Sequence, residues 1–324
     1  MAPAIVINFD CGISAVDAVY AGRHSHSAIH IVVERGQAAI VDTGTNYSIP
    51  ALVDALTQKG VTPEQVAYVI VTHVHLDHAG GAGEAMRRFP NAKLVVHPRG
   101  ARHLIDPSKL VASTVAVYGA EKTQAVYGEI VPVAAERVIA APDGFELDFS
   151  GRKLVFLDTP GHARHHCCIF DETSGGIFSG DTFGISYREF DVDGRAFIFP
   201  ATTPVQLEPE AAHTSIDRLM ALKPQAVYLT HFSRVTGLER LSADLHRRLD
   251  DFVALAREAT GTSEGRHRAL VAKLETYFLE QLATHGCRLP SEEILRLLAG
   301  DIELNAQGLG VWLASKMKLL SEKM

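Results

Sequence analysis

The sequence contains no run of 18 or more consecutive apolar residues. A helix that spans a membrane needs roughly that length, so we expect no membrane partner. Basic residues are not in excess, because 31 Lys and Arg stand against 38 Asp and Glu and the formal net charge is −7. A nucleic-acid partner favours a basic surface, so we expect none. Four cysteines in 324 residues are too few for a disulfide framework, and we expect reduced thiols.

The composition that is present is typical of a globular protein, since 47% of the residues are hydrophobic and 21% are charged. The length allows about two domains of ~150 residues. The first ten residues include no basic side chain and one acid, Asp10, which is not typical of a secretory signal. Together with the reduced thiols, this predicts a cytoplasmic protein.

Residues 1–240 alternate short β-rich runs with turn residues and a few helical stretches, which predicts a layered domain with helices covering sheets. We expect strands at 29–34, 38–42, 67–72, 93–97, 153–158, 176–179 and 226–230, and helices at 48–59, 83–89 and 209–222. Residues 241–324 place apolar side chains near the 3.6-residue period, which predicts a helical subdomain. Its helices are expected at 242–259, after 261–264, from Ser291 and from Asp301.

The strongest chemical signal is the segment 72–81, Thr-His-Val-His-Leu-Asp-His-Ala-Gly-Gly, at the end of a predicted strand. In an extended chain, side chains two residues apart point to the same side, so His73 and His75 can bind one ion. The chain must turn after them, which lets Asp77 and His78 face a second point. Zinc usually takes three or four protein ligands, so the segment predicts two incomplete metal sites.

Other predicted strands also end on side chains that bind metals. His162, Asp181 and His231 each closely follow such a strand, and functional loops gather at strand ends in layered sheets. With the segment 72–81, they make a set of five histidines and two aspartates. Nitrogen and oxygen ligands of this kind suit zinc or a similar borderline ion.

Several segments resemble the metallo-β-lactamase superfamily. They are residues 72–81, Thr-Pro-Gly-His at 159–162, Ser-Gly-Asp-Thr at 179–182, Leu-Thr-His at 229–231 and Ile-Val-Asp-Thr-Gly at 40–44. The resemblance implies an α+β fold, a four-layer αββα sandwich with a dinuclear metal site along one edge. We therefore expect a metallo-β-lactamase-like catalytic domain at 1–240 and a helical C-terminal subdomain at 241–324.

The same resemblance implies seven ligands for two divalent ions. They are His73, His75 and His162 for the first ion, Asp77, His78 and His231 for the second, and Asp181 as the bridge. Zinc is the expected metal, with iron and manganese as alternatives. Asp42 matches a position where an acid orients ligands through hydrogen bonds, and an ordinary turn residue is the alternative reading.

The resemblance also implies a metal-dependent hydrolase that acts on a small molecule. Two ions lower the pKa of a shared water, so a serine or cysteine nucleophile is not needed. We expect cleavage of a lactone, a thioester or a carboxylic ester, with a phosphoester less favoured. Asp77 is predicted to orient the nucleophile or accept its proton. Tyr187 is predicted to donate a hydrogen bond to the substrate carbonyl, with core packing as the alternative.

A second functional class is an oxidoreductase like the persulfide dioxygenases, which have the same fold and use a single iron held by a subset of these positions. Metal analysis and oxygen uptake on a persulfide separate the two classes. A non-catalytic scaffold is the third class, and it is disfavoured because all seven ligand positions are filled.

Four further features are interpreted from their positions. His166 is expected either to support a metal ligand or to pack in the core. His24 and His26 are expected to lie in a loop that lines the site rather than to bind a third metal. Residues 100–138 are longer than a minimal connection and are predicted to form a lid. The apolar stripe of residues 301–313 is expected to pack on its own domain or to form a homodimer.

Overall fold

The computed structural model describes residues 3–203 and 205–321. The chain forms two compact units, each built from separate stretches of sequence. The sheet unit contains the chain up to Thr159 with His165–Gly180 and Lys223–Thr236. The helical unit contains Pro160–Arg164, Asp181–Leu222 and the chain from Gly237 onward. The domain division predicted at residue 240 stays a prediction.

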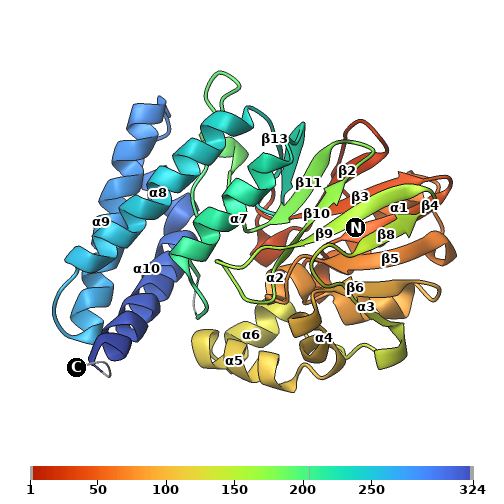
Figure 1. Cartoon of the computed structure of the whole chain (residues 1–324), viewed down its shortest axis with the longest axis horizontal. Helices are drawn as coiled ribbons and strands as arrows, with labels where there is room; N and C mark the ends of the chain where they lie inside the picture. Colours follow the sequence, from red (N-terminus) through yellow and green to blue (C-terminus); the bar gives the residue numbers. More distant parts are fainter. Residues whose placement is uncertain (1–2, 204, 322–324) are drawn as a thin grey trace. The chain divides into compact units, whose positions relative to one another are not determined.

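The first sheet of the sheet unit has seven strands in the order β1-β2-β3-β4-β5-β6-β7 (Figure 1). Pairing is antiparallel from β1 to β4 and parallel from β4 to β7. The strands are β1 (Val6–Asn8), β2 (Ile13–Asp17), β3 (Ala28–Glu34), β4 (Gln37–Val41), β5 (Val66–Val71), β6 (Lys93–Val96) and β7 (Val138–Ala140).

The second sheet has six strands in the order β13-β12-β11-β10-β9-β8. Only the central pair β11 and β12 is parallel, and the other pairs of this sheet are antiparallel. The strands are β8 (Glu146–Phe149), β9 (Arg152–Asp158), β10 (Cys167–Asp171), β11 (Gly176–Gly180), β12 (Ala226–Leu229) and β13 (Ser233–Val235).

Alternation along the strands explains how the two faces of the first sheet are buried. On β4, Ala38 and Ile40 belong to the core beneath the helices, while Ala39 and Val41 belong to the core that the two sheets share. Period-two alternation with both faces apolar is expected of a strand that is covered on both sides. The β-rich runs predicted from the sequence therefore appear as β3, β4, β5, β6, β9, β11 and β12.

Helices of the sheet unit cover the outer face of the first sheet. Apolar residues of α1 (Ile49–Gln58), α3 (Ala82–Arg88) and α4 (Pro98–Ile105) pack into one cluster with the strands. The remaining helices are α2 (Leu76–Ala79), α5 (Ser108–Tyr118) and α6 (Ala120–Tyr127). Helices α4 to α6 occupy most of the segment 100–138, and its action as a lid stays a prediction.

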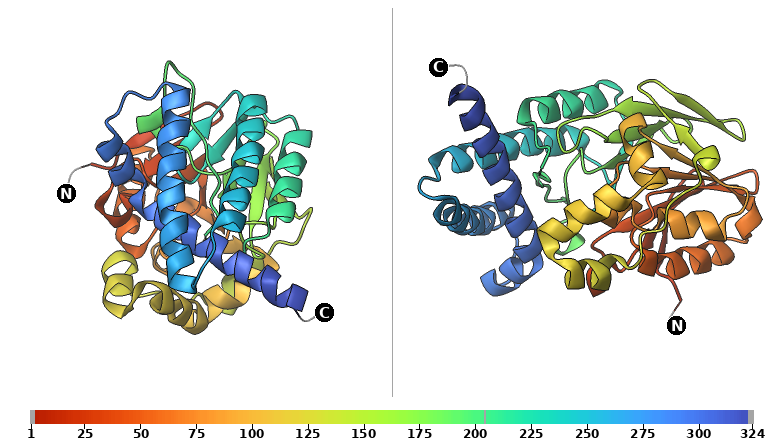
Figure 2. Two further views of the ribbon diagram at one scale, coloured as in Figure 1. Left: turned by 90° about the vertical axis from the view of Figure 1, so that its left-hand side faces the viewer. Right: turned by 90° about the horizontal axis from the view of Figure 1, so that it is seen from below.

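The helical unit is held together by one apolar core. Its helices are α7 (Pro209–Ala221), α8 (Leu238–Glu258), α9 (Ser263–His285) and α10 (Ser291–Ser321). Helix α9 packs against α10, and both contact α8 (Figure 2). The apolar stripe of α10, which includes Ile302, Leu309 and Trp312, is buried in this core. The stripe therefore packs on its own unit, and dimerisation stays a prediction.

Two expectations about secondary structure are wrong or incomplete. A helix was expected to begin at Asp301, but α10 runs without a break from Ser291 past Gly300. Glycine costs about 1 kcal/mol relative to alanine inside a helix, and the buried stripe on both sides of Gly300 outweighs that cost. The strands β1, β2, β7, β8, β10 and β13 were not predicted, since most are short and their pairing depends on distant partners.

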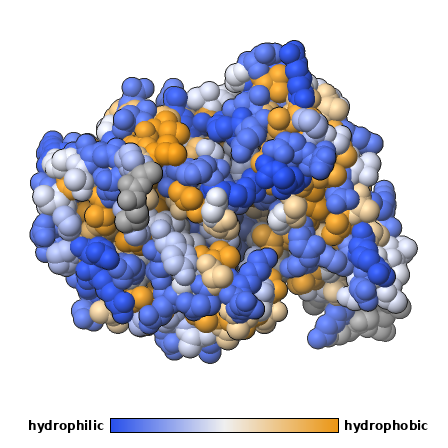
Figure 3. Space-filling view, turned by 180° about the vertical axis from the view of Figure 1, so that it is seen from behind, coloured by the Kyte–Doolittle hydropathy of each residue, from blue (hydrophilic) through white to orange (hydrophobic). Residues whose placement is uncertain are grey.

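The next features are the hydrophobicity of the helices and of one face, and the state of the cysteines. Within residues 3–203 and 205–321, none of the helices combines the length and the hydrophobicity that crossing a bilayer requires. On the face shown in Figure 3, hydrophobic residues form small patches between hydrophilic ones. No disulfide joins the four cysteines, all of which lie in the described part of the chain.

The buried residue His30 makes the stability of the sheet unit depend on pH. His30 lies on β3 with its ring 5.4 Å from that of Phe178 and 5.7 Å from that of Tyr228. Burial lowers the pKa of His30 from 6.5 to about 4, and Asp42 opposes this only in part. Between these two pH values, the unfolded chain binds a proton that the folded chain does not.

We therefore expect His30 to lower the free energy of unfolding by about 3 kcal/mol as the pH decreases from 6.5 toward 4. Above pH 6.5, the contribution of His30 should not change with pH. The variant His30→Leu should lose this contribution. Urea unfolding of both proteins across this range measures it, and parallel pH profiles would contradict the assignment.

Candidate metal centre

The segment that follows β5 brings two histidines together. His73 and His75 follow the end of the strand, and His75, in extended conformation, is the N-cap of the short helix α2. Nε2 of His73 lies 2.9 Å from Nδ1 of His75. The two-residue spacing therefore places two imidazole nitrogens at one point, as the sequence predicts.

The turn into α2 directs the next pair of side chains to another point. Oδ2 of Asp77 lies 3.5 Å from Nε2 of His78 and 3.3 Å from Nε2 of His231, which follows β12. The ligand atoms of these three residues all lie within 4.8 Å of one another. His78 is fully buried and His231 nearly so, while the Asp77 side chain is 23% exposed. This set of nitrogen and oxygen donors suits a divalent metal.

Asp42 ties together the strand ends that carry these ligands. It follows β4 and accepts hydrogen bonds from the Thr72 amide at 2.8 Å and the Thr72 hydroxyl at 3.0 Å, at the end of β5. It also accepts from the Thr230 hydroxyl at 2.7 Å, beside β12, and lies 2.9 Å from Nδ1 of His78. Asp42 is 1% exposed and has a φ of 58°, which aspartate tolerates better than most residues. Asp42 therefore holds the ring of His78 in one orientation.

The hydrogen bonds of Nδ1 determine which ring nitrogen each histidine presents. Nδ1 of His78 donates to Asp42, so Nε2 is left as the lone-pair donor. Nδ1 of His231 likewise donates to the carbonyl of His26 at 2.8 Å, and its Nε2 faces Asp77. Metal-binding histidines usually donate their second N–H to a carboxylate or a carbonyl in this way. The residues therefore fit a metal.

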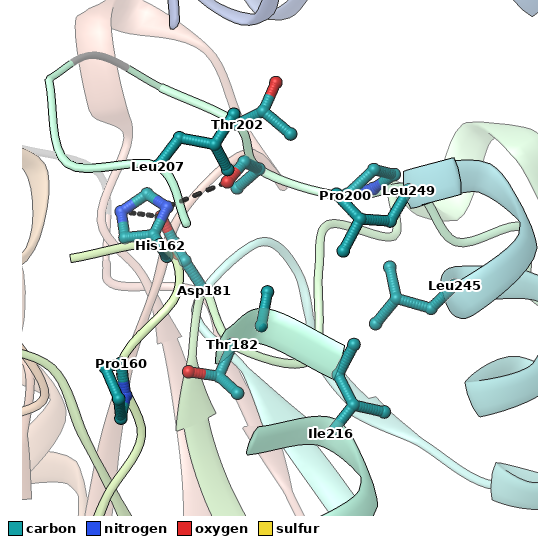
Figure 4. Close-up of a pocket in the computed structure, with 12 residues that line it drawn as sticks. Pro160, His162, Asp181, Thr182, Pro200, Thr202, Leu207, Ile216, Leu245 and Leu249 are labelled. Carbon is teal, nitrogen blue, oxygen red and sulfur yellow. Dashed lines mark hydrogen bonds and ion pairs between the residues drawn. The ribbon is translucent and has the colours of Figure 1, made fainter. Parts of the chain in front are cut away.

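The helical unit supplies a histidine and an aspartate of the same kind. Nδ1 of His162 donates to the carbonyl of Ala201 at 2.9 Å, and Nε2 lies 3.4 Å from Oδ2 of Asp181 (Figure 4). Both side chains are nearly buried. Beside them is a small pocket of about 20 Å³, lined mainly by apolar residues including Leu207, Ile216, Leu245 and Leu249. The pocket has room for about one water molecule.

Glycines in the two motifs permit close approaches that a side chain would prevent. Gly161 has a φ of 134°, and a Cβ there would overlap the backbone of Ala212 on α7. Gly180 has a φ of 48°, and a Cβ there would lie 2.6 Å from Nε2 of His166 and 2.7 Å from the hydroxyl of Thr72. These glycines precede His162 and Asp181 directly, so the motifs need glycine to place those side chains.

A cluster of aromatic side chains lies near Asp77 and His231 in the sheet unit. The hydroxyls of Tyr20 and Tyr127 are 2.8 Å apart, and the ring of His26 stacks on Tyr20 and lies 5.6 Å from that of His231. Burial first, and then nearby groups including Asp77, raise the pKa of Tyr127 well above its usual range. Tyr127 is therefore neutral at physiological pH.

The remaining candidate residues have partners of other kinds. His166 is fully buried, its Nδ1 lies 2.9 Å from the Thr159 hydroxyl, and its ring stacks on His73 at 4.8 Å. His166 therefore supports a predicted ligand by packing. His24 is mostly exposed and pairs with Asp17 at 2.9 Å, and among the described residues neither His24 nor His26 belongs to a group of three metal-binding side chains.

Sequence reasoning missed two hydroxyls and the tyrosine pair. Thr72 and Thr230 each precede a predicted ligand and bond to Asp42. The Thr-His pair that recurs at both strand ends was the signal for them. Tyr20 and Tyr127 are distant in sequence, and no motif could have connected them.

Comparison with known proteins identifies the family. The profile described as the metallo-beta-lactamase superfamily matches residues 22–231. The chain belongs to this superfamily. The metallo-beta-lactamase fold-containing protein ST1585 of Sulfurisphaera tokodaii is 26% identical over 64% of this chain and 78% of its own length. A hydroxyacylglutathione hydrolase of Synechococcus is 26% identical over 71% of this chain and 74% of that protein.

Solved structures of the metallo-β-lactamase superfamily confirm the fold class. The crystal structure of ST1585 has a TM-score of 0.65 and 22% identity, and it covers 92% of this chain and 98% of that one. Protein TTHA1429 of Thermus thermophilus has a TM-score of 0.60 and 20% identity, and it covers 97% of this chain and 92% of that one. The predicted α+β sandwich with a helical C-terminal region is therefore confirmed.

The role of Asp42 predicts the effect of one isosteric change. In Asp42→Asn, an amide nitrogen replaces one acceptor oxygen, and the donors of Thr72, Thr230 and His78 can no longer all be satisfied. We expect the affinity for zinc to fall about 10- to 100-fold and the free energy of unfolding to fall by about 1–3 kcal/mol. Competition with a chromogenic chelator measures the affinity. The control Asp54→Asn changes a surface carboxylate in the same way, and equal affinities in the two variants would contradict the role.

Tyr187 has a partner that bears on its predicted catalytic role. The residue is 1% exposed in the helical unit, and its hydroxyl donates to Asp301 at 3.1 Å and 3.2 Å. A core role predicts that Tyr187→Phe lowers the free energy of unfolding by about 1 kcal/mol and leaves kcat/KM within about twofold. A catalytic donor predicts a fall of 10-fold or more in kcat with unchanged stability. The burial makes us expect the first result, which chemical denaturation and steady-state kinetics would distinguish.

Proposed function

We propose that the protein is a metal-dependent hydrolase of an ester-like bond in a small molecule, namely a lactone, a thioester or a carboxylic ester. The observation that carries this proposal is the buried group Asp77, His78 and His231. Each histidine of this group has its Nδ1 engaged by an oxygen acceptor and its Nε2 turned toward Asp77. Membership of the superfamily supports the same chemistry.

We propose seven ligands for two divalent ions, with zinc as the expected metal. They are His73, His75 and His162 for one ion, Asp77, His78 and His231 for the other, and Asp181 between them. The covalent chain supports the inclusion of the two residues from the helical unit. Asp181 directly follows Gly180, which lies beside Thr72, and consecutive Cα atoms are only ~3.8 Å apart. His162 follows Thr159 by three residues, and Thr159 contacts His166.

The bound ions would lower the pKa of a water toward ~7 and so supply a hydroxide nucleophile at neutral pH. The residues of the chain orient and exchange protons around that water. Asp77 is the most exposed of the three clustered ligands, and its Oδ2 faces both Nε2 atoms, so it is the group that can orient the water and take up its proton. His78 and His231 are held in one orientation by Asp42 and by the carbonyl of His26.

The surroundings of the ligands favour a substrate with a carbonyl group. The hydroxyls of Tyr20 and Tyr127 are 2.8 Å apart, so one donates to the other and the pair can offer its second hydrogen to a carbonyl or hydroxyl group of the substrate. Hydroxyacylglutathione hydrolases are among the relatives of this chain, and their name supports an acyl substrate.

The proposed function predicts the metal content of the protein, its hydrolytic activity and the effect of replacing one ligand, Asp77. We expect about two metal equivalents per chain, and hydrolysis of at least one acyl compound in a panel of lactones, thioesters, carboxylic esters and phosphodiesters with zinc, manganese or iron supplied in turn. Removal of the proton acceptor in Asp77→Asn should lower kcat/KM 100-fold or more, whereas Asp54→Asn should leave it unchanged.

The same samples test the competing oxidoreductase. One iron per chain with oxygen uptake on a persulfide and no hydrolysis of the panel would contradict the proposal. Activity that survives complete removal of metal by a chelator would contradict it as well.

A further inference from the structure

A second histidine pair lies in the helical unit and includes none of the seven proposed ligands. His213 on α7 and His246 on α8 face each other, with their Nδ1 atoms 2.6 Å apart. The rings are nearly parallel, at an interplanar angle of 9°, and their centroids are 4.9 Å apart. The side chains are 27% and 28% exposed, so ions in solvent can reach them.

The far nitrogen of each ring faces a carboxylate of the other helix. Nε2 of His213 lies 3.1 Å from Oδ1 of Asp250 on α8. Nε2 of His246 lies 3.1 Å from Oδ1 of Asp217 on α7. The two helices carry the same motif, a histidine followed four residues later by an aspartate, and this spacing places both side chains on one helix face. The two motifs thus pair crosswise between neighbouring helices.

A count of protons shows what this cluster requires. Both Nε2 atoms must carry a hydrogen to donate to the carboxylates, and the contact between the Nδ1 atoms needs one more. Two neutral imidazoles carry only two such hydrogens. The short contact between the two Nδ1 atoms is therefore a place for a cation, either a proton or a metal ion.

We propose that the His213–His246 pair binds one divalent transition-metal ion between its two Nδ1 atoms, with solvent filling the remaining coordination positions. Histidine ligands commonly donate their second N–H to a carboxylate, and both rings here already do so. Zinc bonds to histidine nitrogen are ~2.0–2.1 Å long, so tetrahedral binding needs the nitrogens ~3.3 Å apart. The two Nδ1 atoms, now 2.6 Å apart, would have to separate by less than one ångström.

The chemistry of the donors limits the ion to a class. Imidazole nitrogen suits zinc, copper and nickel, whereas calcium and magnesium require oxygen ligands. Such an ion would link α7 to α8. His213 directly follows Ala212, against which Gly161 packs. The ion would therefore stabilise the helix that supports the loop of His162.

The test is a zinc titration of the full chain by equilibrium dialysis with elemental analysis. We expect His213→Gln and His246→Gln each to bind one equivalent less than the wild type. The matched control is His267→Gln, which removes an imidazole of the same unit that pairs with Glu303 at 3.1 Å. This control should bind as many equivalents as the wild type. Equal stoichiometry and affinity in all four proteins would overturn the proposal.

A second variant tests the site without removing a ligand. The double variant Asp217→Asn/Asp250→Asn keeps both rings, and we expect the affinity for this one equivalent to fall 10-fold or more because the rings lose their orienting acceptors. Thermal unfolding in the presence of a chelator shows whether each variant is folded. If a histidine variant is not folded, the double variant decides, and unchanged affinity in it overturns the proposal.

Discussion

The buried carboxylate of Asp42 is the interaction on which the proposed site depends. Its two oxygens accept hydrogen bonds at the ends of β5 and β12, and Asp42 itself ends β4. These strands belong to both sheets, so one side chain joins the two layers at the edge where the ligands emerge. A buried charge is costly unless several donors satisfy it, and here four donor groups do so. The hydrogen bond between Asp42 and His78 belongs to this set, and it also fixes the ring of His78. The same side chain therefore stabilises this edge of the sheets and orients a proposed ligand.

One scheme recurs among the histidines, with acceptors of different strength. His162 and His231 donate from Nδ1 to backbone carbonyls, while His78 donates to a carboxylate. Each partner fixes the orientation of its ring and the nitrogen that the ring would present to a metal. The His213–His246 pair uses the carboxylate form of the scheme twice, with aspartates as the acceptors.

Local spacing made the predicted ligands visible in the sequence, and long-range contacts remained invisible. The positions of His73, His75, Asp77 and His78 follow from a strand, a turn and a helix start within one short segment, and the structure has these elements there. The strands with strong β-forming runs were predicted for the same reason. The short strands β1 and β7 were not, because they exist through pairing with β2 and β6. Helix α10 shows the reverse error, since a helix start expected at Asp301 lies inside one continuous helix, Ser291–Ser321.

The site has the same division between local and distant information. Asp42 could be placed in a turn, but that it accepts from Thr72, Thr230 and His78 depends on three separate stretches of chain. The spacing of His213 and Asp217 on one helix can be read from the sequence, whereas the crosswise pairing with Asp250 and His246 depends on how α7 packs on α8.

The central claim is that the proposed ligands hold two divalent ions. Anomalous diffraction from crystals of the zinc-loaded protein tests it most directly. The account predicts two anomalous peaks ~3.5–4 Å apart, one of them within bonding distance of Asp77, His78 and His231. A zinc-loaded crystal with no peak at these three residues would contradict it.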